Sequence, residues 1–197
     1  MLRSLAVAFV VFGYTFNLVQ AQVAQEVPAA TKDSATQLEK CELGHATPVH
    51  RFGKVYLAGQ PTEEDLLELK ADGMRTIINL RPDKELPWNE GAAVKRAGMK
   101  YVHVPFRGEE QLTSTVFDQV LGALRDEESG TTLLHCGSAN RVGAIWYAHR
   151  VLDDELDPVT AELEAKQVGL RDAAYLEKAK EYVETQNRKK QPAVVNE

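Results

Sequence analysis

Strand-like runs alternate with helical segments from residue 55 to about residue 185, and this alternation restricts the fold more than any other feature of the chain. Four apolar or β-branched runs predict strands at Val55–Ala58, Arg75–Leu80, Lys100–Phe106 and Thr131–His135. The segments between these strands show helical periodicity and capping residues, which predict helices. Because strands that alternate with helices form parallel sheets, the pattern predicts an α/β domain with a mostly parallel central sheet covered by helices.

The predicted helices have recognisable beginnings and ends. Thr62 with Asp65 forms a capping box, and Gly73 ends the helix that follows. Asp157 and Pro158 provide an N-cap and a proline in the first helical position. The other helices are predicted at Trp88–Ala97, from Thr113 or Ser114 through Leu124, at Val142–Leu152 and at about Ala173–Thr185.

The chain of 197 residues is long enough for one domain with a real core. Its first 21 residues have a positive start at Arg3, an apolar run from Leu5 to Phe12 and a small residue, Ala21, at a plausible cleavage point. We interpret residues 1–21 as a cleaved signal peptide, which predicts a secreted or periplasmic protein without stable membrane insertion. An uncleaved membrane anchor is the alternative.

The remaining segments follow from composition. Residues 22–43 are predicted to be a flexible lead-in because they lack an apolar period. Residues 44–186 form the predicted domain, and residues 187–197 form a polar tail. The formal net charge of −6 argues against nucleic acid as a partner, so any bound anion must be held by a local site.

Such a site is predicted at "LLHCGSANRVGA", residues 133–144. This stretch joins a buried strand to a helix at the carboxyl end of the sheet, where open α/β folds bind ligands. The helix start at Val142 provides unpaired N–H groups, and Arg141 provides a planar fork suited to phosphate oxygens. The residues between are small, which lets backbone N–H groups approach an anion: Gly137, Ser138, Ala139 and Asn140.

Cys136 lies at the base of this loop and is the candidate nucleophile. Cysteines at helix N-termini near positive groups reach pKa values of about 3.5–7.5 instead of about 8.5, so the thiolate is available near neutral pH. One loop would then hold an oxyanion and place sulfur beneath its central atom. The alternative is a buried structural thiol with a solvated arginine.

The stretch "HCGSANRVGA" resembles the phosphate-binding loop of cysteine-dependent protein tyrosine and dual-specificity phosphatases. A wider region, about Phe52–Leu170, resembles the bacterial beta-lactamase-hydrolase-like phosphatase domains, which are akin to the phosphatase domain fused to NAD kinases. The resemblance includes "VYLAGQPTEEDLLELKADGMRTIINLRPDKE" and "AAVKRAGMKYVHVPF", with Gly59–Pro61 and Ile78–Arg81 among its motifs.

The resemblance implies a cysteine-phosphatase (phosphotyrosine phosphatase II) fold. It also implies hydrolysis of a phosphorylated protein or a small phosphate ester through a phosphocysteine on Cys136, without a cofactor. In the family pattern Arg141 binds the phosphoryl group, and His135 lies under the loop and holds the thiolate geometry. The phosphate-binding set would be Gly137, Ser138, Ala139, Asn140, Arg141 and Val142.

Three departures from the family pattern limit how many of the family's residue roles can be assigned to this chain. Only four residues separate Cys136 from Arg141, as in rhodanese-type sulfurtransferases, where most phosphatases have five. Val142 stands where a serine or threonine usually helps the thiolate leave. The segment "PFRGEEQ" has no aspartate for the general acid, which leaves Glu109 or Glu110 as candidates and solvated surface charges as the alternative for each.

Three functions therefore remain open: a phosphatase, a sulfurtransferase that carries a persulfide on Cys136, and a catalytically weak oxyanion-binding domain. Arg81 is expected on the same rim of the sheet as the loop, where it would add positive potential. The alternative is an ordinary solvent-exposed arginine. A disulfide between Cys41 and Cys136 is left open. No metal site is predicted, because the other histidines (residues 45, 50, 103 and 149) have no ligand spacing.

Overall fold

The computed structural model describes residues 37–190. The predicted signal peptide at residues 1–21, residues 22–36 of the predicted lead-in and residues 191–197 of the predicted tail lie outside the described residues. None of the helices within the described stretch is long and apolar enough to span a membrane.

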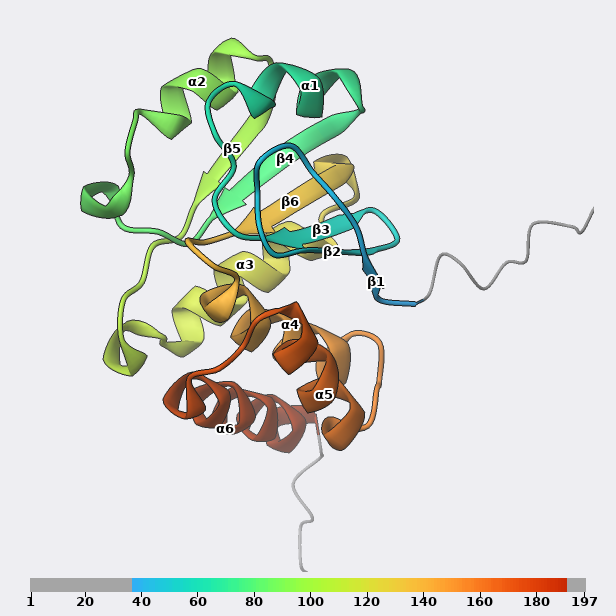
Figure 1. The fold of residues 1–197 in the computed structure, drawn as a ribbon. Coiled ribbons are helices and arrows are strands. Elements are labelled where there is room, and N and C mark those ends of the chain that lie inside the picture. Colours follow the sequence, from blue (N-terminus) through green and yellow to red (C-terminus); the bar gives the residue numbers. More distant parts are fainter. Residues whose placement is uncertain (1–36, 191–197) are drawn as a thin grey trace, which may run out of the picture. The chain divides into compact units, whose positions relative to one another are not determined.

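Six strands and six α-helices make up the described part of the chain (Figure 1). The strands are β1 (Glu39–Lys40), β2 (Val49–Phe52), β3 (Val55–Ala58), β4 (Met74–Asn79), β5 (Lys100–His103) and β6 (Thr131–His135). The helices are α1 (Asp65–Ala71), α2 (Glu90–Arg96), α3 (Ser114–Arg125), α4 (Asn140–Leu152), α5 (Pro158–Val168) and α6 (Ala173–Lys190). Short 3-10 turns are η2 (Asp83–Glu85), η3 (Glu109–Gln111) and η4 (Glu127–Ser129).

The strands form one mixed sheet in the order β1-β2-β3-β6-β4-β5. Strands β3, β6, β4 and β5 run parallel, which confirms the predicted α/β architecture, while β1 and β2 add an antiparallel edge that was not predicted. The register pairs His135 at the end of β6 with Ala58 of β3 and Asn79 of β4. The segment that follows His135 therefore emerges between two neighbouring strand ends.

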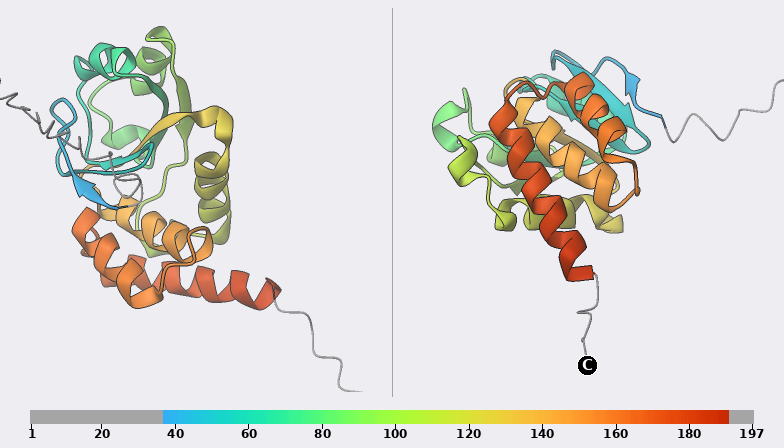
Figure 2. Two further views of the ribbon diagram at one scale, coloured as in Figure 1. Left: turned by 90° about the vertical axis from the view of Figure 1, so that its right-hand side faces the viewer. Right: turned by 90° about the horizontal axis from the view of Figure 1, so that it is seen from below.

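Helices cover both faces of this sheet. Helices α1 and α2 lie on one face, and α3 to α6 lie on the other (Figure 1). Successive residues of β6 point to opposite faces, as strand geometry requires: Leu133 packs in the cluster beneath α1 and α2, and Leu134 packs in the larger cluster beneath α3 to α6. Helix α6 packs along α4 (Figure 2), and both contribute buried residues to the larger cluster.

Several boundaries differ from the prediction. Order begins before residue 44, because Leu38 is buried and Glu39–Lys40 pairs with β2. Helix α1 begins at Asp65 and not directly after Thr62, although the Asp65 carboxylate accepts a hydrogen bond from the backbone N–H of Thr62, as the predicted capping box requires, and also from that of His45. Helix α6 continues to Lys190, past the predicted domain end at residue 186.

The boundary difference that matters most for the loop concerns α4, which begins at Asn140 and not at Val142. Ala139 adopts a left-handed conformation with a φ of 59° and is the residue before the helix. Asn140 and Arg141 consequently belong to the first turn of α4. The loop after β6 is shorter than predicted, and the helix N-terminus lies closer to Cys136 in the chain.

Gly59, in the Gly-Gln-Pro motif, is expected to tolerate no side chain. A Cβ atom there would lie 2.0 Å from the carbonyl oxygen of Thr47 and 3.2 Å from that of Gly137, so backbone must move. We expect Gly59→Ala to lower the free energy of unfolding by about 3 kcal/mol in urea titrations, the upper part of the usual range for overpacking. Gly122→Ala is the matched control, because that site has open space in α3 and alanine favours a helix. Equal stability of the two variants would contradict this prediction.

Candidate active site

The loop from Cys136 to Ala139 connects the central strand β6 to α4. Cys136 is 1% exposed, and its N–H donates to the Ala58 carbonyl at 3.3 Å, which continues the pairing of β3 with β6. The N–H of Gln60 donates to the Gly137 carbonyl at 3.4 Å. These bonds tie the start of the loop to the segment that follows β3.

The loop ends at a helix N-terminus that carries no side-chain cap. Ala139 precedes the first turn of α4 and has no group to accept a hydrogen bond from its N–H donors. The first-turn N–H groups of a helix have no partner within the helix, and the helix dipole makes this end positive. An anion beside Cys136 would meet both effects.

Arg141, in this first turn, is held by the ends of two neighbouring strands. Its Nη1 donates to the carbonyl of Leu80, 3.1 Å away, and to that of Phe106, 3.0 Å away. Its Nη2 donates to Glu85 Oε2 at 2.6 Å. Among residues 37–190, the hydrogen bonds of Arg141 use both of its terminal nitrogens and leave its Nε–H without a partner.

Glu85, in the turn η2, is the carboxylate at this arginine, and three guanidinium groups surround it. Arg81 Nε lies 3.7 Å from Glu85 Oε2, and Arg107 Nε lies 4.0 Å from Glu85 Oε1, in addition to the bond from Arg141. Burial favours the neutral acid, but hydrogen bonding to Arg141 and the three positive charges outweigh it and hold the pKa of Glu85 below its usual value. Arg81 thus lies on the rim of the site, as the sequence predicts.

Glu85→Gln is expected to remove a pH-dependent part of the stability. A carboxyl with a lowered folded-state pKa stabilises the protein above its unfolded pKa of about 4.3, and this contribution disappears as the pH falls through the folded-state value. We expect the variant to lose about 1–2 kcal/mol of unfolding free energy at neutral pH and to match the parent in strong acid. Urea titrations across this pH range measure the difference.

Asp83→Asn is the control for this variant, because its side chain lies on the same turn but is 91% exposed. We expect it to change stability little at any pH. A loss for Glu85→Gln that stays constant on acidification would contradict the ion-pair explanation.

His135 lies behind the loop, as the resemblance implies. It is fully buried, and its Nδ1 faces the Cys136 carbonyl oxygen at 3.4 Å. Its Nε2 lies 2.8 Å from Oε1 of Glu90, whose side chain is also fully buried. The other carboxylate oxygen of Glu90 accepts from Asn79 Nδ2 at 2.7 Å and from Gln60 Nε2 at 3.2 Å.

Two polar residues of the loop bind the segment between α5 and α6. Ser138 accepts hydrogen bonds from the guanidinium of Arg171 at its Oγ and at its carbonyl oxygen. Asn140 Oδ1 accepts from the N–H of Arg171 at 2.8 Å and of Asp172 at 3.1 Å. The sequence left the role of these two side chains undecided. In the structure they fasten the loop to the start of α6.

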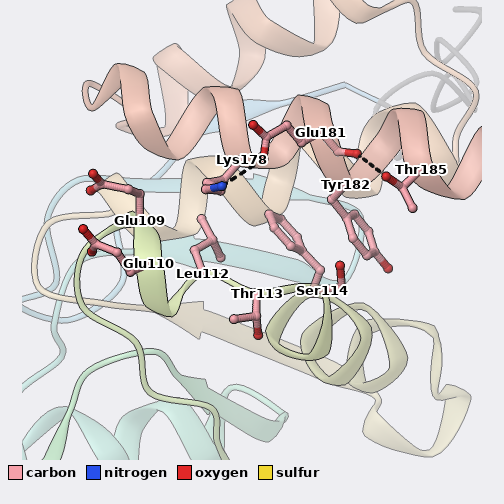
Figure 3. Close-up of a pocket in the computed structure, with 10 residues that line it drawn as sticks. Glu109, Glu110, Leu112, Thr113, Ser114, Lys178, Glu181, Tyr182 and Thr185 are labelled. Carbon is pink, nitrogen blue, oxygen red and sulfur yellow. Dashed lines mark hydrogen bonds and ion pairs between the residues drawn. The ribbon is translucent and has the colours of Figure 1, made fainter.

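Glu109 and Glu110, the predicted candidates for a general acid, lie in the turn η3 and line a cavity of about 300 Å³ between η3, α3 and α6 (Figure 3). The cavity also includes Lys178, Glu181 and Tyr182. None of residues 136–142 lines it. The carboxylate in contact with Arg141 is Glu85, and within residues 37–190 no hydrogen bond or ion pair joins either predicted acid to residues 136–142.

Both cysteines are free thiols. Cys41 packs beside the cluster under α1 and α2, where burial raises the pKa of its thiol, whereas Cys136 belongs to the cluster under α3 to α6. The two thiols therefore lie on opposite sides of the sheet. No group of three or more His, Cys, Asp and Glu residues between residues 37 and 190 is arranged to hold a metal ion.

Sequence reasoning found the loop but missed Glu85, Glu90, Arg107 and Arg171. Glu85 follows Arg81 by four residues in "RPDKE", and this spacing was a usable signal. Glu90 and Arg171 reach the loop from distant segments, and no local pattern marks them. The motif residues Gln60 and Asn79 were noted, and the structure places both on Glu90.

Comparison with known proteins gives a consistent result. The family described as "Beta-lactamase hydrolase-like protein, phosphatase-like domain" matches residues 53–152. The chain is 32% identical over 108 residues to the beta-lactamase hydrolase-like protein of Xylella fastidiosa and 30% identical over 110 residues to that of Agrobacterium fabrum. Each match covers 52% of this chain and 25% of the relative, so the chain spans about a quarter of the length of these relatives.

Solved structures share the fold. P. aeruginosa TpbA has a TM-score of 0.60 at 20% identity, and the match covers 79% of this chain and 92% of that one. Tk-PTP in its active form has a TM-score of 0.56 at 23% identity and covers 67% and 92%. PTPMT1, solved with PI(5)P, has a TM-score of 0.59 at 18% identity and covers 70% and 94%.

Proposed function

Because the chain belongs to the family of phosphatase-like domains of beta-lactamase hydrolase-like proteins, we propose that it is a cysteine-dependent phosphatase of phosphate monoesters. One observation carries the proposal: Cys136 lies at the base of a short loop that ends at an uncapped helix N-terminus, and Arg141 in the first turn of that helix is held by the carbonyls of Leu80 and Phe106. This arrangement provides a nucleophile and donors for a phosphoryl group in one place.

In the proposed reaction the thiolate of Cys136 attacks phosphorus. A sulfur–phosphorus bond forms as the bond to the leaving oxygen breaks, and that oxygen takes a proton from an acid or from water. Water then attacks the phosphocysteine, which releases phosphate and restores the thiolate. Arg141 and the N–H groups of the loop hold the nonbridging oxygens during both steps.

The proposed substrate is a phosphate ester on a protein or a small molecule. P. aeruginosa TpbA has been solved with pTyr and PTPMT1 with PI(5)P, both of which carry a phosphate monoester. Arg107 contacts Glu85, and Arg171 contacts Ser138 of the loop; both guanidinium groups are exposed. These two positive charges favour an anionic substrate, although the net charge of the chain is negative.

The test is hydrolysis of p-nitrophenyl phosphate by the reduced, metal-free chain. This substrate releases a stable anion and needs little help from an acid, so the unassigned general acid does not limit the measurement. We expect turnover that inorganic phosphate inhibits competitively. Saturable phosphate binding without turnover would contradict the proposal and indicate an oxyanion-binding domain.

The four-residue spacing between Cys136 and Arg141 is the one feature that pointed to sulfur transfer, and membership of the phosphatase-like family does not favour it. In that reaction the thiolate takes the outer sulfur of thiosulfate, releases sulfite and passes the sulfur from the persulfide to cyanide as thiocyanate. Thiocyanate formation without hydrolysis of p-nitrophenyl phosphate would select this candidate over the phosphatase.

A further inference from the structure

We propose that Glu90 is a positioning residue that holds His135 as a buried imidazolium behind Cys136 and thereby favours the thiolate. The inference rests on the proposed role of Cys136 as nucleophile. Glu90 lies in the first turn of α2, far from the loop in sequence. Its buried side chain contacts the buried side chain of His135 at the end of β6.

The protonation form follows from what the two ring nitrogens of His135 face. Nδ1 faces the Cys136 carbonyl oxygen at 3.4 Å, and Nε2 lies 2.8 Å from Oε1 of Glu90. A neutral imidazole has one N–H and one lone pair, so with an ionised Glu90 one of these oxygens would oppose a lone pair. The imidazolium carries a proton on both nitrogens and is attracted to both oxygens.

Glu90 has the surroundings of an ionised carboxylate. Its Oε2 accepts two hydrogen bonds, from Asn79 and from Gln60. Its Oε1 and the Nε2 of His135 have no hydrogen bond within residues 37–190, so opposite charge at 2.8 Å is what offsets their burial.

The orientation of the pair determines its effect on the thiol. His135 directly precedes Cys136, and Glu90 lies at the opposite edge of the ring, so the positive end of the pair is nearer the loop. A nearby positive charge favours the ionised thiol. The other ionisable groups near the pair include Tyr101 on β5 and Arg81, which donates to Gln60 Oε1 at 2.6 Å. Asp83, Lys95 and His103 line the same cavity as Glu90.

The experiment measures the alkylation rate of Cys136 by iodoacetamide from about pH 5 to about pH 9, in a Cys41→Ser background so that one thiol reacts. We expect Glu90→Gln to move the half-maximal pH upward by about one unit, which makes alkylation about tenfold slower on the acidic side. An unchanged half-maximal pH would overturn the proposal. A downward shift would also overturn it, because it would mean that Glu90 opposes the thiolate across a neutral His135.

Tyr101→Phe is the matched control, since it removes a hydroxyl from the same hydrogen-bonded cluster without removing a charge. We expect its alkylation profile to match the parent, and an equal upward shift would assign the effect to packing and overturn the proposal. Should Glu90→Gln fail to fold, the ring ¹⁵N signals of His135 in the parent provide the test. Two protonated nitrogens at neutral pH are expected, and one unprotonated nitrogen would overturn the inference.

Alkylation requires no phosphate ester, so the two proposals can fail separately. A chain without hydrolytic activity that shows the expected shift would refute the phosphatase and leave the role of Glu90 standing. A chain that hydrolyses the ester but shows no upward shift in Glu90→Gln would refute the role of Glu90 and leave the phosphatase proposal standing.

Discussion

Cys136→Ser is expected to lower the rate of p-nitrophenyl phosphate hydrolysis by on the order of 10⁴-fold or more, to the level of the buffer, because removal of an enzyme's nucleophile has effects of this size. A serine hydroxyl is a poor nucleophile without a base, whereas a thiol ionises near neutral pH. The loop can still bind phosphate, since its N–H groups and Arg141 are unchanged. Initial rates and phosphate binding measured on the same sample separate the two effects.

The matched control is Cys41→Ser, which alters the other thiol on the opposite side of the sheet. We expect it to retain the parent rate. Because Cys136 is 1% exposed, the urea midpoint of Cys136→Ser must also be measured, so that unfolding is not mistaken for lost chemistry. A folded Cys136→Ser variant with undiminished hydrolysis would refute nucleophilic catalysis at this residue.

Arg141→Lys is expected to lower kcat/KM by about 10²–10³-fold, the cost of removing a donor aimed at developing negative charge. Lysine keeps the charge but has no planar fork, so it cannot contact two phosphate oxygens while it also bonds the strand ends. In the parent these bonds run from Arg141 to Leu80, Phe106 and Glu85. Steady-state kinetics with the same ester provide the measurement.

Arg125→Lys is the control for charge-conserving replacement, because Arg125 pairs with Asp153 on the surface, away from the loop. Its kinetics should equal those of the parent. If Arg141→Lys retains more than about a tenth of the parent kcat/KM, the guanidinium geometry described for this site does not carry phosphoryl binding.

The local parts of the fold were predictable because their signals are local. Alternating strands and helices predicted the parallel sheet, and the position of Cys136 after an apolar run predicted that the loop lies at the carboxyl end of a strand. Predictions failed where a partner from elsewhere intervenes. Strand β1 is placed by its pairing with β2, and β2 by its pairing with β3, and neither of these two strands was predicted from its own short segment.

The candidate site divides in the same way. The sequence by itself located Cys136, Arg141 and, to within two residues, the helix N-terminus, because these lie within six consecutive residues between one strand and one helix. Only the tertiary structure decided that Glu85 holds Arg141, that Glu90 faces His135 and that Arg171 binds Ser138. Each of those contacts joins residues 33 or more positions apart, and local spacing along the chain carries no record of such contacts.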